Sequence, residues 1–340
     1  MKFFNRKKRQ LVYLIEHANW SIKWDGHYIT KNLPTSLSPL LSTNHNRLKN
    51  KIIHYGSKNL FFQETGYSVP HSSNKTVVTW FHVTPGDKTI DLISNAMQHI
   101  DILHTSCTIT SDILIKHGAI KEKMVVIPLG VDTEAFKAPT EDEYHNIRRR
   151  LGISKDKICI GSFQKDGVGW DEGFEPKMVK GPDILCDVLK ELNEEFQIHV
   201  LLTGPARGYV KQKLKQLKIP FTHYFLNEYL DIVDFYKALD LYIVSSRAEG
   251  GPKALLEAMA CGVPLVTTNV GMANDIIENE TNGFIVKKNS AEDLIDISRM
   301  IIKNTNKEQY RMNASASAKK YDWRIIANRY YNEIYSQLMD

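Results

Sequence analysis

One stretch constrains this chain more than any other, the run of residues 241–267. Its first four residues are apolar and predict a buried strand, and a loop with two adjacent glycines follows them. Pro252 suits the first position of a helix because its φ is already helical and its missing N–H is not needed there. Good helix formers fill 253–261, and Gly262 suits the left-handed residue that ends a helix. The run therefore predicts strand, glycine loop, helix and a second strand.

Two carboxylates lie at defined places in this run. Glu249 falls in the loop and Glu257 in the helix, so one lies near the helix start and the other about two turns inside it. The first amides of a helix have no partner within it, and the positive end of the helix dipole attracts a phosphate. Pro252 has no N–H to give. The candidate phosphate-binding amides are therefore those of Gly251, Lys253 and Ala254.

The whole chain has the length and composition of a soluble protein with two domains. It has 340 residues, of which 42% are hydrophobic and 24% charged. Strands and helices alternate in both halves, which predicts two Rossmann-like sheets with a cleft between them. We place the first domain at 1–150 and the second at 151–321. Three adjacent arginines at 148–150, in the connecting helix, are typical of a solvated face.

Charge and cysteine content narrow the range of partners and compartments that fit this chain. The net charge of +5 permits contact with phosphorylated ligands or anionic membranes, and we expect no nucleic-acid partner. Four scattered cysteines without a C-x-x-C pair predict buried thiols in a reducing compartment and no zinc site. The apolar run 11–15 is too short to span a membrane. We expect a cytoplasmic protein, with the basic residues 1–9 favouring peripheral contact at the inner membrane surface.

In the first half, polar residues follow two predicted strands. The run 11–15 predicts a strand, and ligands bind at the carboxyl ends of strands in open α/β sheets. In the loop expected at 19–26, the candidates for meeting a substrate are Trp20, Asp25 and Gly26, although Asp-Gly is equally an ordinary turn signal. His82 ends the strand predicted at 76–81, a position suited to catalysis or substrate orientation, while a lone histidine is more often structural.

In the second half, Lys180-Gly181 ends a long polar insertion at 164–180, and Lys165 lies near its beginning. Gly204 follows the strand predicted at 198–203, where a backbone passing close to a ligand favours glycine. Both lysines are also consistent with ordinary surface positions.

The central stretch, Ser246 to Gly262, resembles the E-x7-E signature of retaining glycosyltransferases of the GT-B fold, and more narrowly of glycosyltransferase family 4. The run 123–132, followed by Phe136, is similar to the segment that closes the N-terminal domain of that family, with Leu129 where Asn is usual. A second departure is Gly250-Gly251-Pro252, which stands where the family has Gly-Phe-Gly. The resemblance implies two Rossmann-like domains facing each other across a cleft, with a final helix at about 322–340 packing back on the first.

The resemblance also implies roles for the candidate residues. Glu257 would bind the ribose hydroxyls of the donor, and Glu249 the sugar hydroxyls, with its charge stabilising the developing cation. His82 would face the donor sugar, and the turn at Leu226 would meet the nucleotide base through main-chain atoms. Lys180 would grip the diphosphate. The arginine that usually assists is absent, and Lys165 is the nearest cation, although it lacks the forked geometry of arginine.

The implied reaction moves a sugar, as in hexosyltransferases, from a nucleotide-sugar to an acceptor hydroxyl with retention at the anomeric carbon. The cationic grip implies no metal and no further cofactor. The expected acceptor is a glycan or a lipid-linked molecule, in polysaccharide, glycolipid or surface-glycan biosynthesis. Two alternatives remain open: a binding module that has lost catalysis, and a non-hydrolysing sugar-nucleotide epimerase. Base, sugar, linkage and oligomeric state also remain open.

Overall fold

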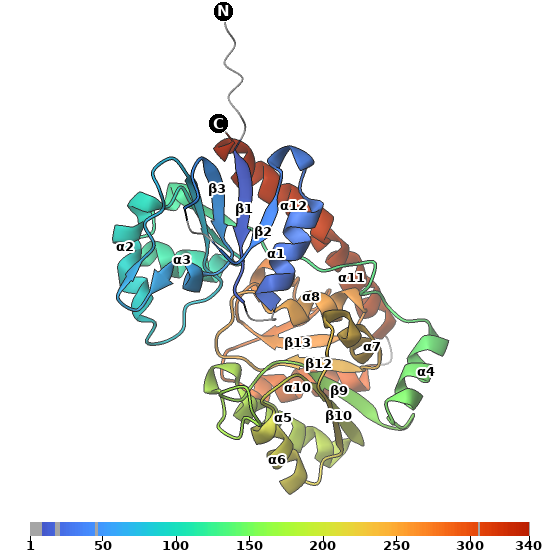
Figure 1. Cartoon of the computed structure of the whole chain (residues 1–340). Coiled ribbons are helices and arrows are strands. Elements are labelled where there is room, and N and C mark those ends of the chain that lie inside the picture. The colour runs from blue at the N-terminus through green and yellow to red at the C-terminus, as the bar shows by residue number, and fades with distance from the viewer. Residues whose placement is uncertain (1–8, 18–20, 45–46, 305–306, 340) are drawn as a thin grey trace, which may run out of the picture. The chain divides into compact units, whose positions relative to one another are not determined.

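The computed structural model describes residues 9–17, 21–44, 47–304 and 307–339. The chain divides into two compact units (Figure 1): the first unit comprises Met1–Gly130 and Tyr321–Asp340, and the second unit Val131–Lys320. The division falls at residue 130, whereas the sequence analysis placed it after 150. The C-terminal tail, beginning at Tyr321, belongs to the first unit.

The connecting helix belongs to the second unit, and a buried arginine is one of the residues that tie it there. Helix α4 (Glu141–Arg150) begins with a complete capping box at Thr140 and Glu143. Arg148 is 2% exposed, and its Nη1 lies 2.8 Å from Oδ2 of Asp240. The prediction that 148–150 form a solvated face is therefore wrong for Arg148, because the carboxylate of Asp240 pairs with it.

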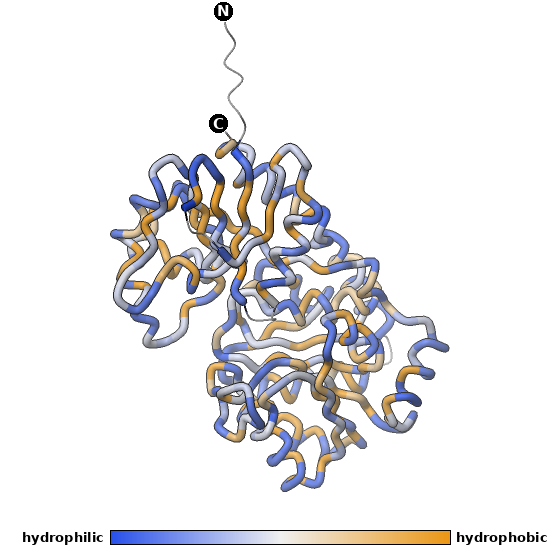
Figure 2. The backbone as a smooth tube through the Cα atoms, in the orientation of Figure 1, coloured by the Kyte–Doolittle hydropathy of each residue, from blue (hydrophilic) through white to orange (hydrophobic). Residues whose placement is uncertain are grey.

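The first unit is built on a parallel sheet of six strands in the order β2-β1-β3-β6-β7-β8. Its hydrophobic strands run through the centre of the unit (Figure 2), and most strand residues are buried. A short antiparallel pair lies outside this sheet. The strands are β1 (Gln10–Leu14), β2 (Leu40–Ser42), β3 (Lys51–Tyr55), β4 (Phe62–Gln63), β5 (Gly66–Tyr67), β6 (Lys75–Thr79), β7 (Ile102–Thr105) and β8 (Met124–Val126).

The helices of the first unit are α1 (Ser21–Asn32), α2 (Ile93–Ala96), α3 (Thr108–Lys116) and α12 (Trp323–Tyr330). The loop predicted at 19–26 is wrong from residue 21 onward, because Asp25 and Gly26 lie inside α1. A Cβ at Gly26 would come within 2.9 Å of the side chains of Tyr13 and Ile15, so glycine allows the helix to pack closely on β1. Trp20 lies outside the described residues.

A chain of buried hydrogen bonds fastens the C-terminal tail to this sheet. His104 Nε2 lies 3.1 Å from the carbonyl oxygen of Ile127, which only accepts, so that nitrogen carries a proton. His104 Nδ1 then accepts from the Thr79 hydroxyl at 2.9 Å, and Thr79 accepts from His54 Nε2 at 2.7 Å. Finally, the hydroxyl of Tyr335 donates to His54 Nδ1 at 2.5 Å. We call these five residues the tail network, and each imidazole in it is satisfied while neutral.

The physical environment keeps the tail network neutral. Burial is the main cause that lowers the pKa of both histidines, to about 4 for His104, and the charge of Arg329 lowers that of His104 further. Tyr335 belongs to the π-helical turn Tyr331–Tyr335 that follows α12. The ring of Trp323, at the start of α12, would lie 2.5 Å from a Cβ at Gly130, so that glycine makes room for the tail.

The second unit has a parallel six-stranded sheet in the order β11-β10-β9-β12-β13-β14. In chain order within the unit this is 3-2-1-4-5-6, the doubly wound Rossmann arrangement. Its switch point, where strand order reverses, lies between β9 and β12. The strands are β9 (Ile158–Ser162), β10 (Ile198–Thr203), β11 (Phe221–Tyr224), β12 (Leu241–Val244), β13 (Leu265–Thr268) and β14 (Phe284–Val286).

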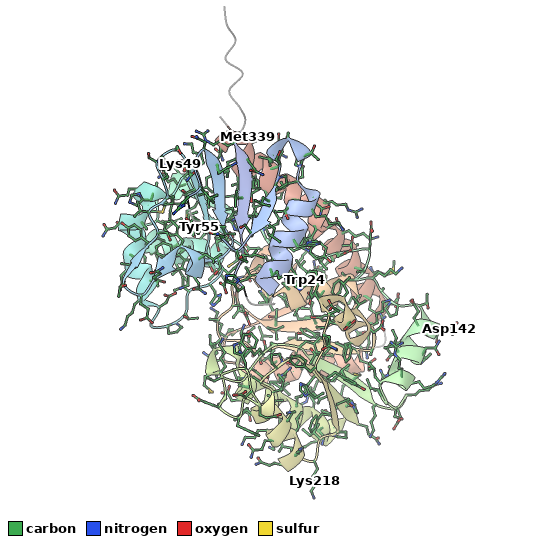
Figure 3. The ribbon with its side chains drawn as sticks, viewed as in Figure 1. Trp24, Lys49, Tyr55, Asp142, Lys218 and Met339 are labelled. Atoms are coloured by element: carbon green, nitrogen blue, oxygen red, sulfur yellow. The ribbon has the colours of Figure 1, made fainter. Side chains whose placement is uncertain are left out.

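Helices of the second unit pack on this sheet around a continuous apolar core. Ser290 caps the helix that begins at Ala291, since its hydroxyl accepts from Asp293 N at 3.0 Å. Charged side chains such as Asp142 and Lys218 are exposed on the surface of this unit (Figure 3). The helices after α4 are α5 (Pro182–Glu195), α6 (Gly208–Gln216), α7 (Ile232–Lys237), α8 (Lys253–Ala260), α9 (Ala273–Ile276), α10 (Ala291–Lys303) and α11 (Lys307–Ala318). Within the described part of the chain, no helix has the length and apolar character needed to cross a membrane.

Candidate functional site

The predicted carboxylates lie at the switch point of the second unit. The loop after β12 begins with the buried Ser245 and Ser246, carries Glu249, and leads into α8. Pro252 caps that helix with φ −69° and ψ 95°, and the helix begins at Lys253, one residue later than predicted. The strand, glycine loop and helix predicted from the sequence are confirmed.

Two glycines allow neighbouring loops to approach this one. Gly181 has φ +62°, and a Cβ there would lie 2.0 Å from the carbonyl oxygen of Ser245. The Ser245 hydroxyl also donates to the carbonyl of Gly181 at 2.8 Å. Gly271 has φ +52°, and a Cβ there would lie 2.2 Å from the carbonyl oxygen of Gly250. The Lys180-Gly181 pair thus lies against the β12 loop because Gly181 has no side chain.

This packing brings Lys180 and Glu249 together. Lys180 Nζ lies 2.6 Å from each carboxylate oxygen of Glu249. The Ser246 hydroxyl is 2.7 Å from Glu249 Oε1 and 3.0 Å from Gln164 Oε1. The side chains of Lys180 and Glu249 are 23% and 11% exposed, so the pair is shielded from solvent and still accessible to a ligand.

Two further lysines lie near this pair. Lys177 precedes the 3₁₀ turn Met178–Lys180, and its amide donates to the carbonyl of Asp166 at 2.8 Å. Burial lowers the pKa of Lys177, the positive charges of Lys180 and Lys165 lower it further, and Glu249 opposes them. Lys165 Nζ lies 3.7 Å from the ring centroid of Trp170. The sequence analysis missed Lys177, although its place three residues before Lys180 was a usable signal.

A buried arginine, also missed, organises the loops after β9 and β10. Arg207 is 1% exposed, and its Nε donates to Asp166 Oδ1 at 3.0 Å. Its Nη1 donates to the carbonyls of Ser162 and Thr203 at 2.7 and 3.0 Å. Burial, opposed by the charge of Arg207, raises the pKa of Asp166. Every contact found for Arg207 is internal, so it acts here as a clamp between loops.

Glu257, the second carboxylate, is 4% exposed and is held by two tyrosines. The hydroxyl of Tyr229 donates to its Oε1 at 2.5 Å, and that of Tyr236 to its Oε2 at 2.8 Å. Burial, reinforced by the charge of Glu257, raises the pKa of Tyr236 well above its usual value, so that hydroxyl stays a donor. Lys253 Nζ lies 4.9 Å from the ring centroid of Tyr229. The sequence analysis did not identify either tyrosine.

The remaining predicted residues are divided between the two units. Gly204 follows β10 with φ +84° in open space, so its backbone conformation requires glycine there. Leu226 follows the edge strand β11 and is half-buried. His82 lies in the first unit after β6 and is exposed, and its carbonyl accepts from Trp80 Nε1 at 3.0 Å. Glu249, Glu257, Lys180 and Lys165 all lie in the second unit.

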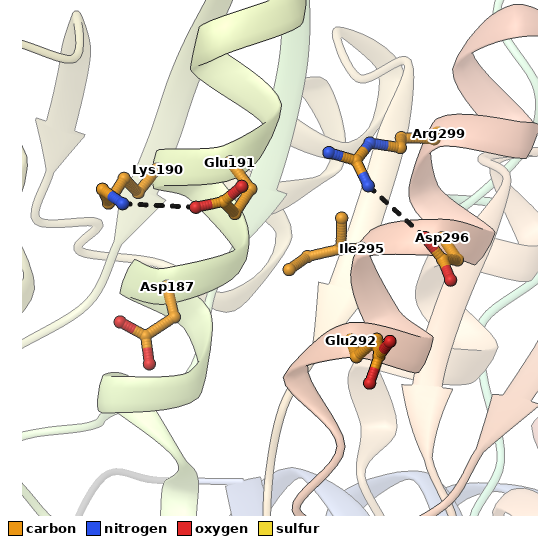
Figure 4. Close-up of a pocket in the computed structure, with 7 residues that line it drawn as sticks. All are labelled: Asp187, Lys190, Glu191, Glu292, Ile295, Asp296 and Arg299. Carbon is orange, nitrogen blue, oxygen red and sulfur yellow. Dashed lines mark hydrogen bonds and ion pairs between the residues drawn. The ribbon is translucent and has the colours of Figure 1, made fainter.

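A surface pocket of about 500 Å³ lies elsewhere in the second unit, between α5 and α10 (Figure 4). Acidic and basic side chains line most of it, and each wall carries an ion pair within its own helix, Lys190 with Glu191 on α5 and Arg299 with Asp296 on α10. None of the predicted site residues lines it. Across the described ranges, no three His, Cys, Asp or Glu side chains gather closely enough to hold a metal ion.

Known proteins resemble this chain in sequence and in structure. Residues 175–321 match the family model described as glycosyl transferases group 1. A D-inositol 3-phosphate glycosyltransferase of Xylanimonas cellulosilytica is 25% identical over 226 residues, which are 62% of this chain and 51% of that protein. The lipopolysaccharide core biosynthesis mannosyltransferase LpsB of Rhizobium meliloti is 28% identical over 181 residues, 50% of this chain and 48% of that protein. The chain spans about half the length of these curated relatives.

Solved structures resemble the chain over nearly its whole length. Anabaena HepE, in complex with UDP and glucose, covers 96% of this chain and 100% of its own with a TM-score of 0.77 at 18% identity. A glycosyltransferase from Rickettsia africae covers 98% and 99% with a TM-score of 0.74 at 16% identity. The α/β GT-B fold expected from the sequence is thereby confirmed. The second unit carries the segment that the glycosyl transferases group 1 model describes.

Proposed function

We propose that the protein is a glycosyltransferase that moves a sugar from a nucleotide-sugar to an acceptor hydroxyl with retention at the anomeric carbon. The observation that carries the proposal is the Lys180–Glu249 pair, placed at the Rossmann switch point beside the start of α8. The chemical problem is the departure of a nucleoside diphosphate. Cations and amides fixed in place before the reaction stabilise the charge that develops on it.

The donor residues divide by the part of the donor that they meet. Lys180 grips the diphosphate, and Lys165 and Lys177 add charge where the family has an arginine. The amides at the start of α8 complete the phosphate site. Glu257 binds the ribose, Leu226 meets the base through its main chain, and Gly204 lets the backbone approach the donor. The phosphate-site amides are those of Gly251, Lys253 and Ala254.

The chemical step requires no protein nucleophile. In a front-side route, the leaving phosphate takes the proton of the acceptor hydroxyl while the new bond forms on the same face of the sugar. Glu249 binds the sugar hydroxyls, and its negative charge stabilises the positive charge that develops on the ring. Lys180, which contacts both oxygens of Glu249, keeps that carboxylate aligned beside the diphosphate. The cationic grip takes the place of a divalent metal.

The first unit supplies the acceptor side. His82 is exposed and is the residue we assign there to catalysis or orientation of the sugar. Asp25 is 2% exposed within α1, and Gly26 serves helix packing. We therefore propose that these two residues act on the acceptor site only by holding α1 in place. Trp20 remains an acceptor-side candidate.

The matched relatives support a biosynthetic role for the enzyme. A cytoplasmic enzyme that extends a glycan or lipid-linked acceptor fits the matched mannosyltransferase named for lipopolysaccharide core biosynthesis. The basic residues 1–9 would favour contact with an anionic membrane.

Thermal unfolding with a panel of nucleoside diphosphates and their sugars tests the donor site. A ligand that binds the native state raises the unfolding midpoint by mass action. We expect one base to stabilise the protein and Glu257→Ala to lose that stabilisation. UDP and UDP-glucose head the panel, because HepE was solved with both. A folded protein that none of them stabilises would contradict the donor site.

A further inference from the structure

The contacts around Glu257 restrict access to it in the binding role proposed for it. A ribose presents two hydroxyls, and both need carboxylate oxygens that can accept. In the structure each oxygen of Glu257 already accepts from a tyrosine, Oε1 from Tyr229 and Oε2 from Tyr236. With Glu257 only 4% exposed, a ribose reaches it only if one of these contacts opens.

The two tyrosines differ in how firmly they are held. Tyr236 is fully buried in α7, and its ring packs against Phe163 and Tyr242 at centroid distances of 4.8 and 5.4 Å. Its movement would disrupt the core beneath the site. Tyr236 therefore keeps its contact and orients the carboxylate.

Tyr229 is less deeply buried than Tyr236. It is half-buried in the short 3₁₀ turn Tyr229–Asp231, which leads directly into α7, and its neighbours Glu228 and Leu230 are exposed. Its ring meets Phe136 at 5.9 Å and Lys253 Nζ at 4.9 Å. Surface turns with few buried contacts open at lower free energy than packed helices. Of the two contacts on Glu257, that of Tyr229 is the one that opens more easily.

We propose that Tyr229 is a gate on the donor site: without nucleotide its hydroxyl occupies Glu257 Oε1, and it leaves when a ribose hydroxyl takes that place. The inference rests on the proposed function, since it assigns Glu257 to the ribose. The exchange replaces one hydroxyl donor by another, so the buried carboxylate is satisfied in both states. Opening also removes the ring from Lys253, which links the gate to the start of α8.

The gate makes the site selective for ribonucleotides. A ribonucleotide restores the hydrogen bond that the departing tyrosine gave up, and its second hydroxyl adds another. A 2′-deoxynucleotide offers one hydroxyl fewer, so opening the gate leaves the carboxylate less well satisfied. A site built to hydrogen-bond a hydroxyl rejects analogues that lack it.

Calorimetric titration of the full chain with UDP, ADP and GDP tests the gate. The tightest of the three is then compared with its 2′-deoxy counterpart on wild type, Tyr229→Phe, Tyr236→Phe and Glu257→Gln. We expect Tyr229→Phe to bind the ribonucleotide about tenfold more tightly, because no hydroxyl has to be displaced. Tyr236→Phe should bind more weakly, and Glu257→Gln should lose the discrimination against the deoxynucleotide. Tyr229→Leu, which also removes the hydroxyl, should bind more tightly than wild type.

The outcomes separate the gate from the donor site. Unchanged or weaker binding by both Tyr229 variants, with discrimination lost in Glu257→Gln, would overturn the gate and leave the donor site intact. A folded wild type that binds none of the three nucleotides would overturn the donor site, and the gate with it.

Discussion

Two buried polar clusters, one in each unit, satisfy their hydrogen bonds in opposite ways. The tail network of the first unit consists of neutral groups and ends at a backbone carbonyl. In the second unit, Lys180 and two tyrosines contact carboxylates, Glu249 in the loop after β12 and Glu257 inside α8. In both clusters the central groups, imidazoles in the first and carboxylates in the second, have hydrogen-bond partners. A hydrogen-bond network serves structure when its donors are fixed in the core, as in the tail network. We expect a donor on a loop or turn, such as Tyr229, to be replaceable by a ligand.

The largest expected effect comes from the charged cluster. Lys180→Met removes the cation that we propose grips the diphosphate, and we expect kcat/KM for sugar transfer to fall about 10³-fold. The matched control is Lys190→Met on α5, whose side chain is 51% exposed. Steady-state kinetics with the donor found by thermal unfolding provides the measurement. A loss below tenfold would mean that the pair is structural, like the tail network.

The second effect is a loss of stability at acidic pH, and it comes from the tail network. His104 is buried and its pKa falls from 6.5 to about 4 on folding, because burial disfavours the charged ring. Between these values the unfolded chain binds more protons, so stability is full above pH 6.5 and falls as the pH drops toward 4. The full loss from this residue is about 3 kcal/mol.

Urea unfolding of the first unit, followed from pH 7.5 to 4.5, measures this loss. The control His117→Gln, at an exposed site after α3, should keep the same pH dependence. His104→Gln should be less stable at neutral pH and show a shallower dependence. A wild-type stability that stays constant over this range would show that the tail network tolerates charge.

The smallest effect distinguishes the cations within the donor site. Lys177 lacks a carboxylate partner as close as that of Lys180, and its pKa is lowered chiefly by burial. We expect Lys177→Met to raise KM for the donor about tenfold and to leave kcat nearly unchanged, as loss of uniform binding does. A fall in kcat with unchanged KM would place Lys177 at the reacting bond.

The elements that could be predicted from the sequence are those marked by signals within a few neighbouring residues. Strand β10 was located at its observed bounds, 198–203, and the loop, the helix α8 and Lys180 were found because glycine, proline and apolar signals coincide within a few residues. Helix α1 was missed because Asp25-Gly26 reads as a turn, while its glycine serves packing against a distant strand. The buried Arg148 was missed because its partner, Asp240, lies far along the chain.

In the proposed donor site too, only the residues marked by local sequence signals could be predicted. Both glutamates could be read from spacing and context, but the tyrosines that hold Glu257 come from another segment, and neither carries a motif. Arg207 was also unpredictable, since its buried pairing with Asp166 depends on two loops meeting. Residues that act through long-range contacts require the fold before they can be assigned.

Analysis of the reaction product is the most direct test of sugar transfer with retention. The nucleotide-sugar selected by thermal unfolding is incubated with glycan and lipid-linked acceptors, and the product is examined by mass spectrometry and by NMR of the anomeric proton. We predict a product one sugar larger, with the donor's anomeric configuration, and one nucleoside diphosphate released per transfer. An inverted product, or tight nucleotide-sugar binding without transfer to any acceptor, would contradict the account.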